Sequence, residues 1–297
     1  MRRRSPPSSR GSSLSARRTT DLGPHSAVDR TPLAKRLRAA GCVFAEDEAE
    51  LLLTAATTPD QLEQMVQQRL RGLPLEQILG WAEFGGLRVA LEPGVFVPRR
   101  RTELILQQAL MLAPPRPVVV ELCCGSAALA LAVASPLRDV ELYVTDIDPA
   151  AVRCARRNLA NLPEPAVVLQ GDLYEPLPQS LVGRVDLLLA NAPYVPTDSI
   201  ELMPPEARLY EPRTALDGGS DGLDLLRRII AGARLWLAPS GRLVLETSRS
   251  QAPETVATCE RHGLSARIVS SDELDGTVVL AWPAPGGIND EHAGAGH

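Results

Sequence analysis

Short runs of apolar residues alternate with longer amphipathic segments over most of the chain beyond Pro98. An apolar run of four to six residues predicts a buried strand, and apolar positions that recur every three or four residues predict a helix. The expected strands are Val118–Leu122, Glu141–Thr145, Val167–Gln170, Val185–Ala190, Arg242–Glu246, Ala266–Ser270 and Thr277–Trp282. The expected helices are Ser126–Ala134, Pro149–Leu159, Leu223–Leu237 and Pro253–His262. This alternation predicts an α/β fold with a doubly wound, mainly parallel sheet.

The segment before Pro98 has a different pattern. Helical periodicity predicts three short helices, Leu33–Ala40, Ala45–Ala56 and Asp60–Arg71. From Trp81 to Val97, short extended pieces are interrupted by Gly85-Gly86 and Pro93-Gly94, which predicts a hairpin-like connector.

These patterns divide the chain into five parts. We expect a small helical domain at residues 29–80, the connector at 81–97 and the sheet domain at 98–283. Residues 1–28 are rich in Ser, Arg and Pro, and residues 284–297 are rich in Gly and Ala. Because neither end segment has enough apolar residues to form a core, both are expected to be disordered tails, and the first is basic.

The composition indicates a globular protein. Of its 297 residues, 44% are hydrophobic, which is enough to fill a core. No apolar run approaches the roughly 18 residues that a membrane helix needs, so we expect a cytoplasmic protein without a membrane partner. The five cysteines form no CxxC pair, which predicts core positions rather than a disulfide framework or a metal site.

The distribution of charge argues against a broad nucleic-acid surface. The first 30 residues hold seven Arg and two Asp, and the remainder carries 24 basic and 34 acidic side chains. Nucleic-acid-binding domains are instead enriched in Lys and Arg. The cluster Arg99-Arg100-Arg101 could contact phosphate, although its place in the connector favours a structural role.

Acidic and small residues at the ends of three expected strands form a pattern typical of an adenosyl cofactor site. Glu121 lies near the end of the first strand, and Cys123 and Gly125 follow it before a helix, so the backbone could approach a ligand closely. Asp146 follows the second strand, where its carboxylate could accept both hydroxyls of a ribose. Asp172 follows the third, where it could accept the exocyclic amine of adenine. Each signal alone is weak, because acidic residues after strands also cap helices.

The tetrapeptide Asn191-Ala192-Pro193-Tyr194 follows the fourth expected strand and is suited to binding a planar NH₂ group. The Asn191 side-chain oxygen can accept one N–H, the backbone carbonyl of Ala192 can accept the other, and the Tyr194 ring can pack on the plane. An amine or amide held in this way could be directed at an electrophile. The alternative is an ordinary turn from strand to loop, because Asn and Pro are common turn formers.

In this order, the four strand ends resemble those of the class I methyltransferases. The resemblance implies a Rossmann-like domain with a seven-stranded, mostly parallel sheet, and it implies S-adenosylmethionine as the cofactor. The family usually has three alternate glycines after the first strand. Here Gly125 matches the middle one, while Cys123 and Ala127 replace the outer two. Both are small, but neither accommodates a positive φ as readily as Gly.

Further segments resemble the HemK/PrmC family of protein-glutamine methyltransferases. They are Gly80–Phe84, Val97–Glu103 and the segment that begins at Glu211-Pro212 and runs through Gly218-Gly219 to Leu223. The resemblance implies methyl transfer to a glutamine side-chain amide in a protein, with a translation release factor that carries a Gly-Gly-Gln loop as the substrate. The helical domain would then be the docking surface for this protein partner.

The same resemblance implies roles for the site residues. Asn191, Ala192, Pro193 and Tyr194 would form the catalytic tetrapeptide, with Ala192 where the family has Pro. Asn191 would contact both cofactor and substrate. Glu211 and Pro212 would extend the substrate site. The cofactor residues would be Glu121, Cys123, Gly125, Asp146, Asp172 and Asn191.

Two other functions remain open at the level of the sequence. Several nucleic-acid methyltransferases, which act on adenine N6 or guanine N2, have a similar tetrapeptide. They need aromatic platforms and phosphate contacts, however, and aromatic residues are only 3% of this chain. A cofactor-binding protein without catalytic activity is the second alternative, because both the glycine loop and the tetrapeptide are altered.

Overall fold

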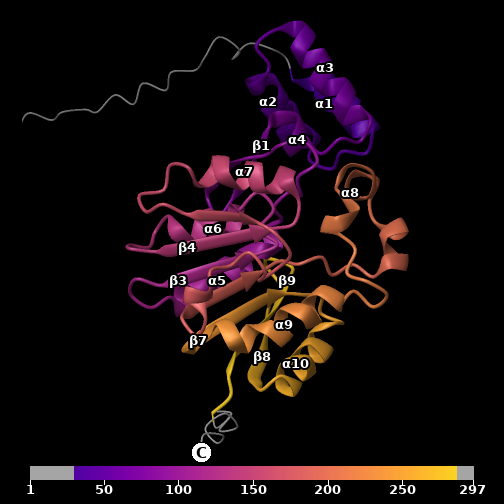
Figure 1. Ribbon diagram of the computed structural model, residues 1–297. Helices are drawn as coiled ribbons and strands as arrows, with labels where there is room; N and C mark the ends of the chain where they lie inside the picture. Colours follow the sequence, from indigo (N-terminus) through magenta and orange to yellow (C-terminus); the bar gives the residue numbers. More distant parts are fainter. Residues whose placement is uncertain (1–29, 286–297) are drawn as a thin grey trace, which may run out of the picture. The chain divides into compact units, whose positions relative to one another are not determined.

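The computed structural model describes residues 30–285 (Figure 1). The chain forms two compact units, one up to Leu62 and one from Glu63 onward. The boundary between the two units falls inside the helix Pro59–Leu70, whereas we expected a domain boundary at residue 80. The expected tail at residues 1–28 lies outside the described residues, as does most of the one at 284–297. Within residues 30–285, the helices are all too short or too polar to cross a membrane.

The first unit is helical, as predicted. It contains α1 (Thr31–Ala39), α2 (Ala45–Ala55) and the start of α3 (Pro59–Leu70). Buried apolar side chains of α1 and α2, including Leu37, Ala49 and Leu52, form its core. Two exposed apolar residues, Val43 and Phe44, lie between these two helices.

The second unit begins with the rest of α3, the short helix α4 (Leu75–Leu79) and a two-stranded antiparallel hairpin. The hairpin pairs β1 (Trp81–Phe84) with β2 (Leu87–Ala90), with Trp81 opposite Ala90. Its turn residues Gly85 and Gly86 have φ of 57° and 75°, as a tight hairpin turn requires. The predicted hairpin is thus confirmed, while α4 is too short to show a helical period in the sequence.

Seven strands form one sheet in the order β5-β4-β3-β6-β7-β9-β8. All pairings are parallel except those of β9, which runs antiparallel to both β7 and β8. The strands are β3 (Val118–Leu122), β4 (Glu141–Asp146), β5 (Val167–Gln170), β6 (Val185–Ala190), β7 (Leu237–Glu246), β8 (Leu264–Ser271) and β9 (Gly276–Pro283). This arrangement confirms the predicted seven-stranded, mostly parallel sheet. The chain order reverses between β3 and β6, which is where such sheets bind ligands.

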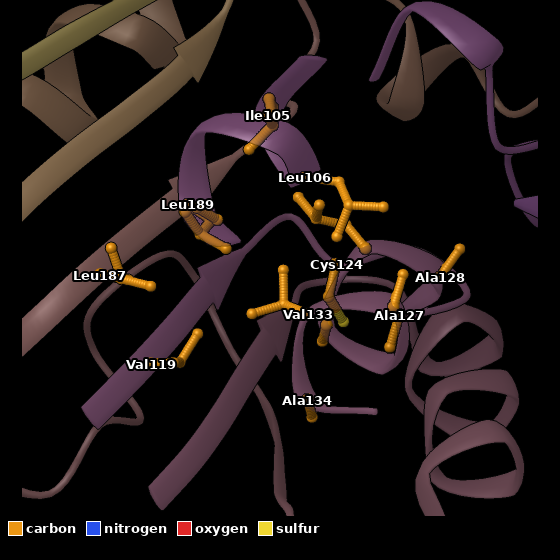
Figure 2. Close-up of a cluster of buried hydrophobic side chains, with 14 of the residues drawn as sticks. Ile105, Leu106, Val119, Cys124, Ala127, Ala128, Val133, Ala134, Leu187 and Leu189 are labelled. Atoms are coloured by element: carbon orange, nitrogen blue, oxygen red, sulfur yellow. The ribbon is translucent and has the colours of Figure 1, made fainter. Parts of the chain in front are cut away.

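Helices cover both faces of this sheet (Figure 1). On one face, α5 (Glu103–Leu112), α6 (Ala128–Ala134) and α7 (Pro149–Leu159) pack on alternate strand residues such as Val119, Leu187 and Leu189 (Figure 2). On the other face, α9 (Asp224–Trp236) and α10 (Ala252–Arg261) pack on the residues between them, such as Val120 and Leu188. Burial on both faces explains why these strands read as continuous apolar runs.

Two segments near the carboxyl ends of the strands have structure that the sequence pattern does not predict. A 3₁₀ turn η1 (Arg100–Thr102) leads into α5. Between β6 and α9 the chain forms η3 (Thr197–Leu202), α8 (Pro205–Tyr210) and η4 (Arg213–Ala215). Each of these pieces is too short to produce a recognisable period.

Candidate active site

A cavity of about 670 Å³ lies at the carboxyl ends of β3, β4, β5 and β6. Its size is within the range of small-molecule sites, roughly 300–1,000 Å³. Each of the four strand ends contributes to its wall. The residues expected at a cofactor or substrate site that line it are Glu121, Cys123, Gly125, Asp146, Asp172, Asn191, Pro193 and Pro212. The structure therefore brings together most of the residues that the sequence singles out.

The loop after β3 adopts left-handed backbone at three alternate residues. Cys123, Gly125 and Ala127 have φ of 55°, 54° and 57°. The loop thus has a geometry that favours glycine at all three positions, even though two of them carry a Cβ. Left-handed backbone at a non-glycine residue costs about 1–2 kcal/mol, so the surrounding packing must stabilise Cys123 and Ala127 in this conformation.

Gly125 is the point of this loop that is open to a ligand. A Cβ built there meets no atom within 4 Å. Its N–H donates to Asp146 Oδ2 at 2.8 Å, which ties the loop after β3 to the end of β4. The loop and the cavity therefore fit an adenosyl group held against the backbone, as S-adenosylmethionine requires.

We expect Gly125→Ala to weaken cofactor binding about tenfold or more, because the added methyl group would occupy space in the cavity. An alanine at this left-handed φ should also lower the free energy of unfolding by about 1–2 kcal/mol. Gly86→Ala is the matched control, because Gly86 also has a positive φ and open space but does not line the cavity. Calorimetric titration and thermal unfolding of both variants test this. Equal cofactor affinities for the two variants would contradict it.

Asp146 and Glu121 both organise the backbone around the cavity. Asp146 accepts a second N–H, from Asp148, at 2.9 Å, and burial raises its pKa. Glu121 is buried and its Oε2 accepts the N–H of Ala130 in the first turn of α6 at 2.9 Å. Burial raises the pKa of Glu121 to about 8. Glu121 therefore anchors a helix in addition to lining the cavity.

We expect Glu121→Gln to flatten the pH dependence of stability between pH 4.5 and about 8. In this window the folded protein keeps a proton on Glu121 that the unfolded chain releases, so the free energy of unfolding falls as pH rises. The glutamine can still accept the Ala130 N–H but does not titrate. Thermal unfolding across this window should show the variant gaining on the parent protein toward high pH. If the stability of the variant and of the parent protein changed equally with pH, the raised pKa of Glu121 would be disproved.

Asp172 has a partner that the sequence does not suggest. Its Oδ2 accepts a hydrogen bond from Arg228 of α9 at 2.8 Å, and Arg228 also lines the cavity. An arginine that is 56 residues further along the chain, in a separate helix, leaves no local signal in the sequence. The Asp172 carboxylate therefore faces the cavity as part of an ion pair.

The tetrapeptide borders two cavities. Asn191 and Pro193 line the large cavity, and all four residues line a smaller one of about 50 Å³. Asn191 Nδ2 donates to Thr102 Oγ1 at 3.1 Å, and the Tyr194 hydroxyl donates to Glu246 Oε1 at 2.9 Å. Ala192 is almost fully buried. A group bound between the cavities would lie against Asn191.

Glu211 and Pro212 are neighbours in the chain but line different cavities. The Glu211 side chain lines the small cavity and accepts hydrogen bonds from the Val97 N–H at 3.2 Å and from Arg99 at 2.6 Å. Burial raises its pKa. Pro212 lines the large cavity. Glu211 therefore joins the connector to the segment after the tetrapeptide, besides lining the predicted substrate site.

The segment after Glu211 folds closely over the tetrapeptide. A Cβ at Gly218 would lie 2.8 Å from both the Pro193 carbonyl oxygen and the Tyr194 Cα. Only glycine permits this approach. The Gly218-Gly219 pair thus has a packing role beside the site.

The arginine cluster Arg99-Arg100-Arg101, which follows the connector, faces carboxylates. Arg99 pairs with Glu211 at 2.6 Å, Arg101 Nε lies 3.4 Å from Glu246, and Arg100 lies 3.9 Å from Glu273. These contacts favour the structural role of the cluster over a phosphate contact. Like Arg228, Thr102 and Glu246 are site residues for which the sequence predicts no role, although Glu246 ends β7 as Asp146 ends β4.

Comparison with known proteins gives consistent matches. The methyltransferase small domain family matches residues 86–205. A release factor glutamine methyltransferase of Geobacter sulfurreducens is 38% identical over 70% of this chain and 72% of its own. One of Mycolicibacterium smegmatis is 35% identical over 77% of this chain and 82% of its own.

Among solved structures, a methyltransferase from Pyrococcus furiosus aligns with a TM-score of 0.51 at 16% identity, over 66% of this chain and 88% of that chain. This likeness supports the fold alone. The family match at residues 86–205 covers the cofactor loop and the tetrapeptide. The chain therefore belongs to the release factor glutamine methyltransferase (HemK/PrmC) family, whose cofactor is S-adenosylmethionine.

Proposed function

We propose that this cytoplasmic protein methylates the side-chain amide nitrogen of a glutamine in a peptide chain release factor. One observation carries the proposal. Asn191 lies at the carboxyl end of β6, between the large cavity and the small one, with its Nδ2 engaged by Thr102. Its Oδ1 is therefore the group left to accept an N–H from a substrate.

The cofactor would occupy the large cavity. Asp146 would accept the ribose hydroxyls, Asp172 would accept the adenine amine, and the loop around Gly125 would lie against the adenosyl group. Glu121 would stabilise this loop through α6. When bound there, S-adenosylmethionine supplies an electrophilic methyl group.

The tetrapeptide would orient the substrate amide. An amide nitrogen is a poor nucleophile because its lone pair is delocalised into the carbonyl group. Asn191 Oδ1 and the Ala192 carbonyl would accept its two N–H groups, which raises the electron density on nitrogen and fixes its direction. Correct orientation alone can contribute several kcal/mol to lowering a barrier.

Tyr194 would pack against the amide plane. Its hydroxyl is held by Glu246, and burial raises the pKa of Tyr194, so the ring is neutral and fixed. The amide needs no strong base before transfer, because its proton becomes acidic only once the nitrogen has gained positive charge. The residues present at the site can therefore support this reaction.

The helical unit would dock the protein substrate. Val43 and Phe44, which are 81% and 69% exposed, present apolar surface between α1 and α2. Aromatic side chains such as Phe44 are enriched in protein interfaces. This supports the proposed docking role for residues 29–80.

The test is methylation of purified release factor with labelled S-adenosylmethionine, followed by mass spectrometry of the labelled peptide. We expect one methyl group on the glutamine of the Gly-Gly-Gln loop and none on a release factor in which that glutamine is alanine. Total RNA incubated in parallel should stay unlabelled. Label in RNA would favour a nucleic-acid substrate, and cofactor binding without any turnover would favour an inactive protein.

A further inference from the structure

Arg228 is a charged residue of the large cavity that has no part in the proposed function. Its neighbours Ile229 and Ile230 are buried in the core under α9, while the Arg228 side chain lines the cavity. Arg228 Nη2 donates to Asp172 Oδ2 at 2.8 Å, and the two side chains are 51% and 31% exposed. An ion pair with this much access to water contributes little to the stability of a fold. The pair does, however, set the direction of the Asp172 carboxylate.

The backbone on both sides of Asp172 is fixed by hydrogen bonds. The Gly171 N–H donates to the Asp146 carbonyl at 3.0 Å. On the other side, the Leu173 carbonyl accepts the Thr145 hydroxyl at 2.9 Å. The backbone of Asp172 is therefore held at the end of β5, and only the rotation of its side chain is left to be determined.

The two carboxylate oxygens of Asp172 have different surroundings. Oδ2 accepts from Arg228, whereas Oδ1 has no hydrogen-bond partner within residues 30–285. An ionised carboxylate can only accept hydrogen bonds, so Oδ1 is the atom that can receive an N–H from a molecule in the cavity. The contact with Arg228 thus holds one oxygen toward α9 and leaves the other for a ligand.

Purine bases differ in the group that they present to such an oxygen. Adenine carries an exocyclic amine, which donates, whereas hypoxanthine carries a carbonyl at the same position, which accepts. A carboxylate pairs with the amine and is repelled by the carbonyl. A guanidinium, which has only donors, does the reverse. The side chain that meets the base, Asp172 or Arg228, therefore decides which base is preferred.

We propose that Arg228 is a positioning residue that sets the base selectivity of the cofactor site. It holds Asp172 with Oδ1 toward the exocyclic amine of adenine, and Asp172 in turn occupies the Arg228 guanidinium, which would otherwise favour a carbonyl. This inference rests on the proposed function in one respect, namely that Asp172 accepts the adenine amine. It does not depend on which substrate group is methylated.

The test is calorimetric titration of the full-length protein with S-adenosylhomocysteine and with S-inosylhomocysteine, in which a carbonyl replaces the amine of the base. Selectivity is the ratio of the two Kd values. We expect the parent protein to bind the adenosyl ligand about 100-fold more tightly, because only this ligand gives the carboxylate a hydrogen bond and the other leaves it facing an acceptor.

Three variants measure the contribution of the ion pair. Arg228→Met keeps a long side chain without a donor, and we expect it to lower the selectivity about 3- to 10-fold, mainly through weaker binding of the adenosyl ligand. Arg228→Lys keeps a charged donor and should stay within about threefold of the parent selectivity. Asp172→Ala frees the guanidinium, so the two affinities should come within about threefold of each other or favour the inosyl ligand.

Arg227→Met is the matched control. Arg227 precedes Arg228 in α9 and also forms an ion pair, with Asp221 at 2.5 Å, but it does not line the cavity. We expect both affinities to be unchanged in this variant. Thermal unfolding of all variants checks that the fold is intact.

The outcomes separate this inference from the proposed function. If a folded Arg228→Met keeps the parent selectivity, or if it loses affinity for both ligands equally, the positioning role is wrong. Equal binding of the two ligands by the parent protein would show that Asp172 does not read the base, and the inference would fall with that role. If the selectivities are as expected but the parent fails to methylate a glutamine, the proposed function is wrong and the role of Arg228 stands.

Discussion

We expect Asn191→Ala to lower kcat for glutamine methylation by on the order of 10²–10³-fold or more, because it removes the acceptor that orients the substrate nitrogen. Since the cavity and the strand-end carboxylates remain, the Kd for S-adenosylmethionine should change by less than about twofold. Single-turnover methylation of release factor and calorimetric titration with the cofactor measure the two quantities separately.

The control for this prediction is the same substitution at an exposed position. Asn161 lies in a turn after α7 and is exposed, so Asn161→Ala should leave kcat unchanged. Thermal unfolding of both variants checks that the fold is intact. Methylation retained at the parent rate in Asn191→Ala would refute the assignment of the tetrapeptide.

Asp146→Ala should have the opposite profile, with a loss of cofactor affinity as its main effect. A carboxylate that binds two hydroxyls contributes about 1.5–3 kcal/mol for each charge-assisted hydrogen bond, so we expect the Kd for S-adenosylmethionine to rise at least about 100-fold. The variant also loses the acceptor for the Gly125 N–H, which loosens the loop after β3. At saturating cofactor, kcat should recover in large part.

Asp146→Asn separates these two effects. The amide keeps an oxygen that can accept the Gly125 N–H but loses the charge that binds hydroxyls strongly. We expect its affinity for the cofactor to lie between those of the parent protein and Asp146→Ala. An unchanged Kd in both variants would show that Asp146 serves only the backbone.

The sheet could be predicted well because its strands are buried on both faces. Val118–Leu122 and Val185–Ala190 have the bounds that their apolar runs predict. At β7 the structure extends the strand back to Leu237, through a Pro239-Ser240-Gly241 sequence that favours a turn, and the pairing with β6 shifts register there. The turn residues therefore lie within the strand, at the irregularity in its pairing, and do not mark its first residue. Helix α5 was not predicted, because its apolar residues are not confined to one face.

From the strand pattern alone, the site could be predicted only where its residues follow strands. Parallel strands bring their carboxyl ends together, so Asp146, Asp172 and Asn191 could be grouped from their positions alone. The contact of Thr102 with Asn191 spans 89 residues, and that of Glu246 with Tyr194 spans 52. Such contacts have no periodic signal in the chain. Arg228 was missed for the same reason.

The position of β9 has a consequence for how the enzyme matures on the ribosome. This strand is the last along the described chain, yet it lies between β7 and β8 in the sheet. Until β9 has emerged from the ribosome, the edge of β7 that pairs with it has unpaired N–H and C=O groups. Glu246 at the end of β7 then also has no neighbour from β9. Synthesis proceeds from the amino terminus, so the cofactor loop and the tetrapeptide emerge well before the sheet can close. The active site would thus be complete only after β9, the last strand of the described chain, has been synthesised.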